Sequence, residues 1–220
     1  MVHLKGVCTS IITAILLSAY QPATIEKRNL GLMSPQLGRL GERAIAAEKA
    51  PAQSLTISDR GIGSALLGMT VGKLKQTLGS KAQFQVSSPY QVDFDALAVS
   101  QSGKVQYRII YPARTKLKDT EAIELLMTDN SNYKTAQGVK PGMTLKQAEA
   151  IYGKATLSYH IENESRERVI FAKQPSQKIS FVPKVKGKQV AGIYGAGKGG
   201  YFETNQYQPN AVIESIWVRK

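Results

Sequence analysis

A twelve-residue phrase that occurs twice sets the strongest constraint on how this chain folds. Residues 68–79 read GMTVGKLKQTLG, and residues 142–153 read GMTLKQAEAIYG. Both copies open with Gly-Met-Thr and close with Gly at the same spacing, 74 positions apart. Two copies of one unit predict two similar pieces of structure in tandem.

Each phrase predicts a short helix with marked ends. Thr70 and Thr144 are suitable N-caps, and Gln147 lies where it completes a capping box with Thr144. Lys73 takes that place in the first copy, so the first box is half made. Apolar residues at i, i+3 and i+7 form one stripe on each helix, and the closing glycine suits the residue just past a helix end. Because helices of about two turns are marginal alone, each is expected to lie on a sheet.

Segments of alternating or continuous apolar residues predict the strands of that sheet. They are residues 55–57, 84–86, 92–99, 105–111, 155–161, 166–172, 178–182 and 211–218. A turn at 101–104 predicts a hairpin, and residues 119–127 (DTEAIELLM) predict a further short helix. The fold class is therefore expected to be α+β, with two tandem pseudo-repeat modules, each a short helix (or helix pair) packed on an antiparallel β-meander.

The chain divides into four predicted parts. They are a signal peptide (1–23), a flexible linker (24–54), a first α+β module (55–128) and a second (129–220). Lys5 precedes an apolar run, IITAILLSA, which is too short to span a bilayer, and cleavage after Ala19 or Ala23 fits the small residues that follow. We therefore expect a periplasmic or secreted protein without an integral membrane span after cleavage. The only cysteine, Cys8, would be removed with the signal, so no disulfide or thiol nucleophile is expected.

The excess of positive charge favours anionic partners but does not identify one class of them. Lys and Arg outnumber Asp and Glu by 29 to 16, which gives a net charge of +13. Such an excess favours nucleic acids, acidic proteins or anionic lipid in general. The alternative is a basic surface that serves solubility alone.

The motifs that carry enzyme chemistry are weak. Residues 192–198 satisfy G-x-x-x-x-G-K, but neither the Ser or Thr nor the helix of a phosphate-binding loop follows, so no nucleotide is expected. His160 is the only histidine outside the predicted signal, and one histidine makes no zinc site without acidic partners. Asp93 and Asp95 share one side of a predicted strand and are interpreted as its solvent side. We therefore predict no enzyme activity, cofactor or metal.

Aromatic residues next to lysines give the strongest indication of a contact surface. Tyr194, Tyr201, Phe202 and Tyr207 lie within fourteen positions, close to a group of lysines in residues 184–198. This combination suits a protein interface, a glycan or a single-stranded nucleic acid. The predicted partner-binding residues are Tyr159, Tyr194, Lys198, Tyr201, Phe202 and Tyr207. The alternative is that the aromatic rings pack on the sheet and the lysines are merely solvated.

The glycine-bracketed Gly-Met-Thr helix followed by a meander resembles the modules of two exported bacterial groups. These are the β-lactamase inhibitory proteins, with two modules in tandem, and the small lipoprotein of the outer-membrane β-barrel assembly machine, with one. It is also similar to exported, mostly uncharacterised bacterial proteins that carry a GIG…GMT…LG phrase twice. The resemblance covers residues 61–218 and implies a sheet face offered to a protein or envelope partner. This chain lacks the inhibitor's disulfides and the lipoprotein's lipid-bearing cysteine, so neither specific activity is expected.

These observations predict an exported, non-enzymatic protein-binding module of the cell envelope. Contact is expected through the sheet face and the basic, aromatic loop 184–207. One alternative is a basic nucleic-acid-binding protein, whose binding would depend steeply on salt. A second is an envelope-polymer hydrolase that uses Asp93 and Asp95 or Glu164 as carboxylates.

Overall fold

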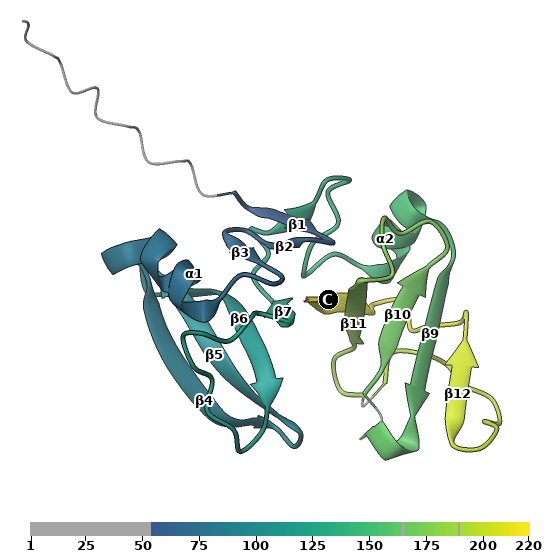
Figure 1. Ribbon diagram of the computed structural model, residues 1–220. Coiled ribbons are helices and arrows are strands. Elements are labelled where there is room, and N and C mark those ends of the chain that lie inside the picture. The colour runs from purple at the N-terminus through teal and green to yellow at the C-terminus, as the bar shows by residue number, and fades with distance from the viewer. Residues whose placement is uncertain (1–53, 164–165, 189) are drawn as a thin grey trace, which may run out of the picture. The chain divides into compact units, whose positions relative to one another are not determined.

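The computed structural model describes residues 54–163, 166–188 and 190–220 (Figure 1). The predicted signal peptide and all of the predicted linker except Ser54 lie outside these residues. The described part is α+β, with two α-helices and mostly antiparallel strands, as the sequence predicts. No helix within it is long and apolar enough to span a bilayer.

The strands form a small sheet and a large one. The small sheet has the order β3 (Ala65–Leu66), β2 (Gly61–Ile62), β1 (Thr56–Ser58) and β8 (Lys134–Thr135), with β1 and β8 parallel. The large sheet is antiparallel and has the order β12 (Tyr201–Thr204), β9 (Ala155–His160), β10 (Arg168–Phe171), β11 (Ile179–Lys184), β13 (Val212–Arg219), β7 (Leu125–Thr128), β6 (Lys104–Pro112), β5 (Phe94–Gln101) and β4 (Gln83–Gln91). The helices are α1 (Val71–Leu78) and α2 (Leu145–Tyr152), with short 3-10 turns at Gly79–Lys81 and Ile161–Asn163.

Both predicted helices are confirmed, together with their caps. Thr70 Oγ1 accepts the Lys73 amide at 3.2 Å, so α1 has half of a capping box. Thr144 Oγ1 accepts the Gln147 amide at 3.2 Å, and Gln147 Oε1 accepts the Thr144 amide at 3.0 Å, so α2 has the whole box. Each helix buries its apolar stripe and ends at a glycine with positive φ. The local sequence therefore specifies these two elements.

The backbone around the two Gly-Met-Thr phrases makes matching hydrogen bonds. The amide of Gly68 donates to Ile123 O, and the amide of Gly142 donates to Ile213 O, both at 2.8 Å. The longer strands of the two predicted modules nevertheless belong to one large sheet, joined where β7 pairs with β13, and the small sheet also pairs β1 of the first module with β8 of the second. A repeat of the whole helix-plus-meander module, and a boundary at residues 128/129, therefore stay predictions.

The prediction of a helix at residues 119–127 is wrong. This segment runs through a turn and enters β7, whose Leu126 is fully buried. The carbonyls of Asp119 and Glu121 accept the amides of Gly72 and Val71 at the start of α1, at 2.8 and 3.0 Å. Pairing of β7 with β6 and β13, together with these bonds to α1, outweighs the weak helical preference of a nine-residue segment.

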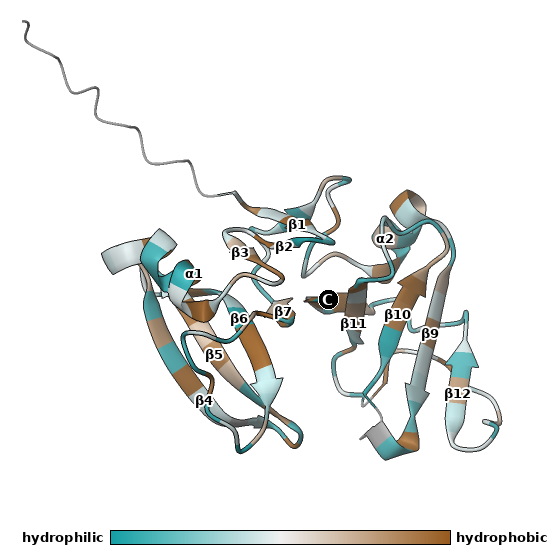
Figure 2. Cartoon of the chain, viewed as in Figure 1, coloured by the Kyte–Doolittle hydropathy of each residue, from teal (hydrophilic) through white to brown (hydrophobic). Residues whose placement is uncertain are grey.

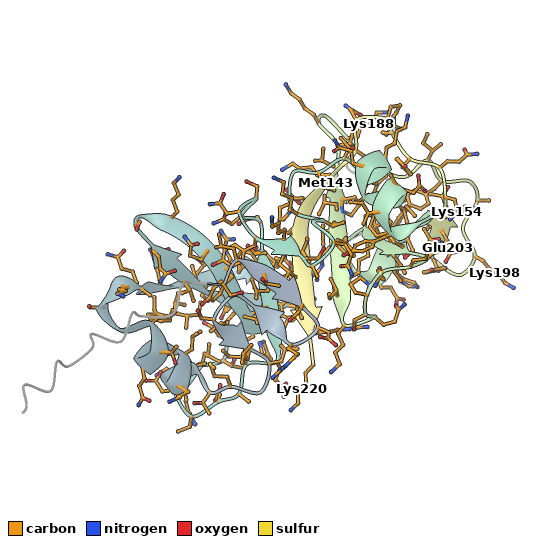
Figure 3. The ribbon with its side chains drawn as sticks, turned by 90° about the horizontal axis from the view of Figure 1, so that it is seen from above. Met143, Lys154, Lys188, Lys198, Glu203 and Lys220 are labelled. Atoms are coloured by element: carbon orange, nitrogen blue, oxygen red, sulfur yellow. The ribbon has the colours of Figure 1, made fainter. Side chains whose placement is uncertain are left out.

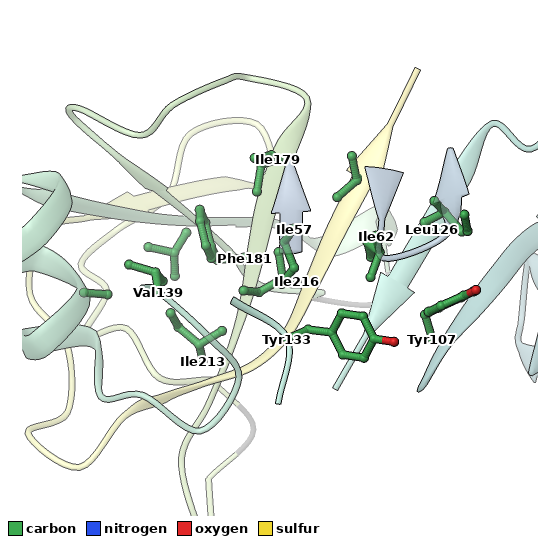
Figure 4. Close-up of a cluster of buried hydrophobic side chains, with 14 of the residues drawn as sticks. Ile57, Ile62, Tyr107, Leu126, Tyr133, Val139, Ile179, Phe181, Ile213 and Ile216 are labelled. Atoms are coloured by element: carbon green, nitrogen blue, oxygen red, sulfur yellow. The ribbon is translucent and has the colours of Figure 1, made fainter. Parts of the chain in front are cut away.

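The main core lies between the large sheet and the elements that cover one of its faces. Ile57 and Ile62 of the small sheet pack beside Leu126 and Ile216 of the large one (Figure 4). The buried stripes of α1 and α2 belong to the same cluster. We call this side of the large sheet the covered face.

The opposite side of the large sheet, here called the open face, carries a second and smaller apolar cluster. Its buried members are Ala96, Ile110, Met127 and Trp217, with Tyr90, Phe94, Leu125 and Val182 packed against them. All eight residues lie on strands, so no helix of the described chain contributes to the cluster. Apolar segments follow the strands of both halves (Figure 2). Among the described residues, no helix or second sheet packs over this smaller cluster, so the open face lacks a covering layer there.

Candidate binding face

Three arginine side chains lie over aromatic rings on the open face. The pairs are Arg168 with Trp217 at 5.5 Å, Arg166 with Phe94 at 5.6 Å and Arg108 with Tyr90 at 5.7 Å, measured from guanidinium carbon to ring centroid. A guanidinium over a ring is attracted by the negative face of the π system. The pairs come from strands of both halves of the large sheet and the segments beside them, so the tertiary fold assembles them.

Strand alternation places these groups. In β13, Ile216 and Val218 enter the main core, while Trp217 points to the open face. The Trp217 indole N–H donates to Ser215 Oγ at 3.0 Å, two residues earlier on the same face. This bond satisfies the buried N–H and fixes the ring, which leaves its plane as the floor on which Arg168 lies.

Arg168 differs from the other two arginines in its partners. Arg166 donates to Asp93 Oδ2 at 3.1 Å, and Arg108 donates to Asp129 Oδ2 at 2.9 Å. Arg168 donates to Ser180 Oγ at 3.2 Å, and no carboxylate of the described residues forms an ion pair with it. Burial lowers the pKa of Arg168, and the charges of Arg166 and Arg219 lower it further. A guanidinium has five N–H donors, so Arg168 retains donors for an anion.

Two pockets adjoin on the open face, and a third, which also reaches Ile109 and Tyr111 of the main core, adjoins the first. Their volumes are about 280, 290 and 440 Å³. The first two share Arg168 and Trp217 as walls, and the first and third share Phe94 and Leu125. Hollows lined by aromatic rings and arginine are typical of surfaces that bind partners or ligands.

Three of the predicted binding residues form one aromatic cluster on the covered side. Tyr159 stacks on Phe202 with centroids 4.7 Å apart and planes at 7°, and Tyr194 meets Tyr159 edge-on at 4.8 Å. All three are half-buried. A Cβ on Gly197 would lie 2.5 Å from the Phe202 ring, so glycine lets the loop lie directly on that ring. The cluster packs the loop against β9 and β12.

A buried carboxylate fixes the same loop. Glu167 is 5% exposed, and it accepts the amides of Ala191 at 2.6 Å and Gly192 at 2.7 Å and the hydroxyl of Tyr194 at 2.6 Å. Burial raises the pKa of Tyr194, and its hydrogen bond to Glu167 adds to the rise. The mixed charges of residues 162–168 suggest a solvated, ion-paired edge, but Glu167 is buried and that interpretation is wrong for it. Alternation is the missed signal, because Arg166 and Arg168 flank Glu167 and lie on the other face.

The other three predicted residues lie apart. Tyr207 donates to Glu149 Oε2 of α2 at 2.7 Å; burial and this bond raise its pKa to about 12. Tyr201 is 46% exposed and pairs with His160 across β12 and β9, which places it on the side opposite Phe202. Lys198 extends outward beside the edge strand, near Glu203 and away from Lys188 (Figure 3). The six predicted residues thus do not share one surface, and Tyr201 has the open-face orientation.

The carboxylates considered for hydrolysis are not brought together. Asp95 is 3% exposed and accepts the Arg114 amide at 3.1 Å, so its assignment to the solvent side is wrong. The reason is that Asp95 shares its face with Leu97 of the main core, whereas Asp93 precedes β5 and pairs with Arg166. Glu164 lies outside the described residues. Among those residues, no group of three His, Cys, Asp or Glu side chains has a metal-binding arrangement.

Comparison with known proteins gives a structural neighbour but no family. No family model and no curated protein matches the chain. A solved structure, the uncharacterized protein yfeY from Escherichia coli, is 14% identical, covers 75% of this chain and 99% of its own, and has a TM-score of 0.48. A likeness at this level assigns neither a family nor a function.

Proposed function

We propose that this chain is an exported, non-enzymatic protein that binds a partner protein of the cell envelope on its open face. The observation that carries the proposal is the set of three arginine–aromatic pairs beside adjoining pockets, on a sheet face that no described helix or second sheet covers. Tryptophan, tyrosine and arginine are the residues that most often dominate binding energy at interfaces. Planar rings and guanidinium groups held in place by hydrogen bonds also lose little freedom on binding.

Charge supports an acidic partner. The chain has a net charge of +13, and Arg168 and Arg219 form no ion pair with a described carboxylate. Complementary potentials across an interface speed association and exclude partners of like charge. The chain's own residues 24–54 suit this face poorly, because they carry five Lys or Arg and three Glu.

The proposed location rests on the N-terminal sequence. The short apolar run before residue 20 has the length of a signal peptide core, and the helices of the described residues include no candidate membrane span. Fractionation of cells that express the full chain should place it in the envelope or the medium. Recovery in the cytosol with the N-terminus intact would contradict this part of the proposal.

Site-specific photo-crosslinking tests the binding face. Ile170 is 44% exposed and lines the first pocket. Val86 is 57% exposed and is the cross-strand partner of Leu97, so it lies on the covered face. A photoreactive residue at Ile170 should capture one envelope protein, and Arg168→Gln in the same chain should reduce that capture at least fivefold. The same residue at Val86 is the matched control. Capture through Val86 alone, or through neither position, would refute the open face as the binding surface.

The loop residues predicted from the sequence are tested in the same assay. Tyr201→Ala combined with Lys198→Ala should reduce capture through Ile170 if the edge of the sheet extends the contact. Unchanged capture would limit the interface to the open-face cluster. Binding of nonspecific DNA by the purified chain with a steep salt dependence, without a protein partner, would favour the nucleic-acid alternative instead.

A further inference from the structure

The first pocket of the open face differs in charge from its neighbours. Its eleven lining residues include two arginines and no carboxylate: Phe94, Leu125, Ser158, Arg168, Ile170, Gln174, Gln177, Ile179, Ser180, Trp217 and Arg219. Asp129 and Glu214 line the second pocket, and Glu121 and Glu124 line the third. The first pocket is therefore the cationic one of the three.

We propose that this pocket is a binding site for a compact organic acid, with one carboxylate and a flat apolar body. The site deepens the proposed function because it lies on the same face, but it can bind such an acid whether or not a protein partner is present. The volume of about 280 Å³ lies just below the usual range of ligand pockets, which favours a single-ring molecule over a polymer.

The carboxylate position follows from Arg168. Its guanidinium is held between the Trp217 ring and Ser180 Oγ, and it has no acidic partner among the described residues. A partly buried guanidinium without a counter-ion is unfavourable, and a carboxylate supplies both the missing charge and two parallel acceptors. Arg219, on the same wall, is placed to add a second cation.

The position of the apolar body follows from the remaining walls. Phe94 and Trp217 supply the aromatic walls, with Arg168 over the Trp217 ring. Leu125 and Ile170 supply the aliphatic ones. Gln174 is not free to turn toward a ligand, because its amide already bonds to the backbone of Phe171, Ser176 and Ile179. A ring that stacks in the pocket therefore replaces water on apolar surface while its acid group reaches Arg168.

Trp217 makes the test direct because it is the only tryptophan of the chain and a wall of the pocket. The probe is 3-phenylpropionate, titrated into the full chain and followed by tryptophan fluorescence and by calorimetry. We expect saturable binding, at least tenfold weaker binding of the neutral 3-phenylpropionamide, and weaker binding of acetate, which lacks the ring. Equal binding of the acid and the amide, or of phenylpropionate and acetate, would overturn the proposal.

Variants locate the site. Arg168→Gln should weaken 3-phenylpropionate binding at least tenfold and leave the binding of 3-phenylpropionamide unchanged. If this variant fails to fold, Arg219→Gln, which changes an exposed side chain, tests the same prediction. Lys104→Gln removes one charge at the turn between β5 and β6 and should leave binding unchanged. Loss of binding in all three variants would indicate a general charge effect and refute the site. Binding of an acidic, aromatic peptide but of no free acid would also refute it, while the crosslinking through Ile170 would still stand.

Discussion

Glu167→Ala removes the acceptor that holds the loop 191–194 against the sheet. Three donors lose their partner: the buried amides of Ala191 and Gly192, and the Tyr194 hydroxyl. A buried amide left without an acceptor costs about 1–1.5 kcal/mol, and a half-buried hydroxyl that can turn to water costs about 0.5–1 kcal/mol. The expected loss in the free energy of unfolding is therefore about 3 kcal/mol.

Two further variants measure how much individual hydrogen bonds contribute to this loss in the free energy of unfolding. Glu167→Gln keeps one carbonyl acceptor but aims its NH₂ group at a donor, so a loss of about 2 kcal/mol is expected. Tyr194→Phe removes one bond and should cost about 1 kcal/mol in the natural chain but almost nothing in the Glu167→Ala background. The coupling in this double-mutant cycle should thus be about 1 kcal/mol.

Urea unfolding followed by Trp217 fluorescence measures these changes, with linear extrapolation to water. Glu162→Ala is the matched control because its side chain is 85% exposed, and it should change the free energy of unfolding by less than about 0.5 kcal/mol. A Glu167→Ala chain that loses less than about 1 kcal/mol at an unchanged m value would refute the assignment of Glu167 as the buried anchor of the loop.

Three other measurements test local features. Thr144→Ala should lower the free energy of unfolding by about 1 kcal/mol, because it removes the hydroxyl of the complete capping box. Gly197→Ala should lower it by about 1–3 kcal/mol through the clash with Phe202, whereas Gly195→Ala, with open space around its Cβ, should have little effect. Tyr207 keeps its proton to about pH 12 in the folded chain and loses it near pH 10 when unfolded, so the unfolded state binds fewer protons in this window. Stability should therefore fall as the pH rises from 10 to 12, and Tyr207→Phe should make this fall shallower in urea titrations at each pH.

Local sequence patterns predict the two helices correctly. Long-range strand pairing determines the structure of residues 119–127, which local patterns do not predict. The caps at Thr70 and Thr144 depend on contacts within four residues, so the sequence specifies them directly. Residues 119–127 also contain helix-favouring residues, but pairing with β6 and β13 makes the end of that segment a strand. Intrinsic preference is too weak to resist such tertiary contacts over a short segment.

The candidate binding face was missed for a related reason. Arg168 and Trp217 are 49 positions apart and meet because β10, β11 and β13 are neighbours, which no local spacing reveals. Alternation along 166–170 and 215–219 does show which residues avoid the core. The density of aromatic residues in 194–207 instead reflects rings that pack the loop on the covered side.

Because β13 is the last strand in the sequence and lies in the middle of the large sheet, the sheet can be completed only at the end of synthesis. β13 pairs with β11 on one side and with β7 on the other, and among the described strands its bonds to β7 are the ones that join the two groups of strands. A nascent chain that has emerged only to residue 211 has two separate ribbons, with bare edges at β7 and β11. Bare edges recruit other strands, so this intermediate is the stage most exposed to mispairing. β13 covers both bare edges, and it also contains Trp217. The open face is therefore complete only when this last strand has docked.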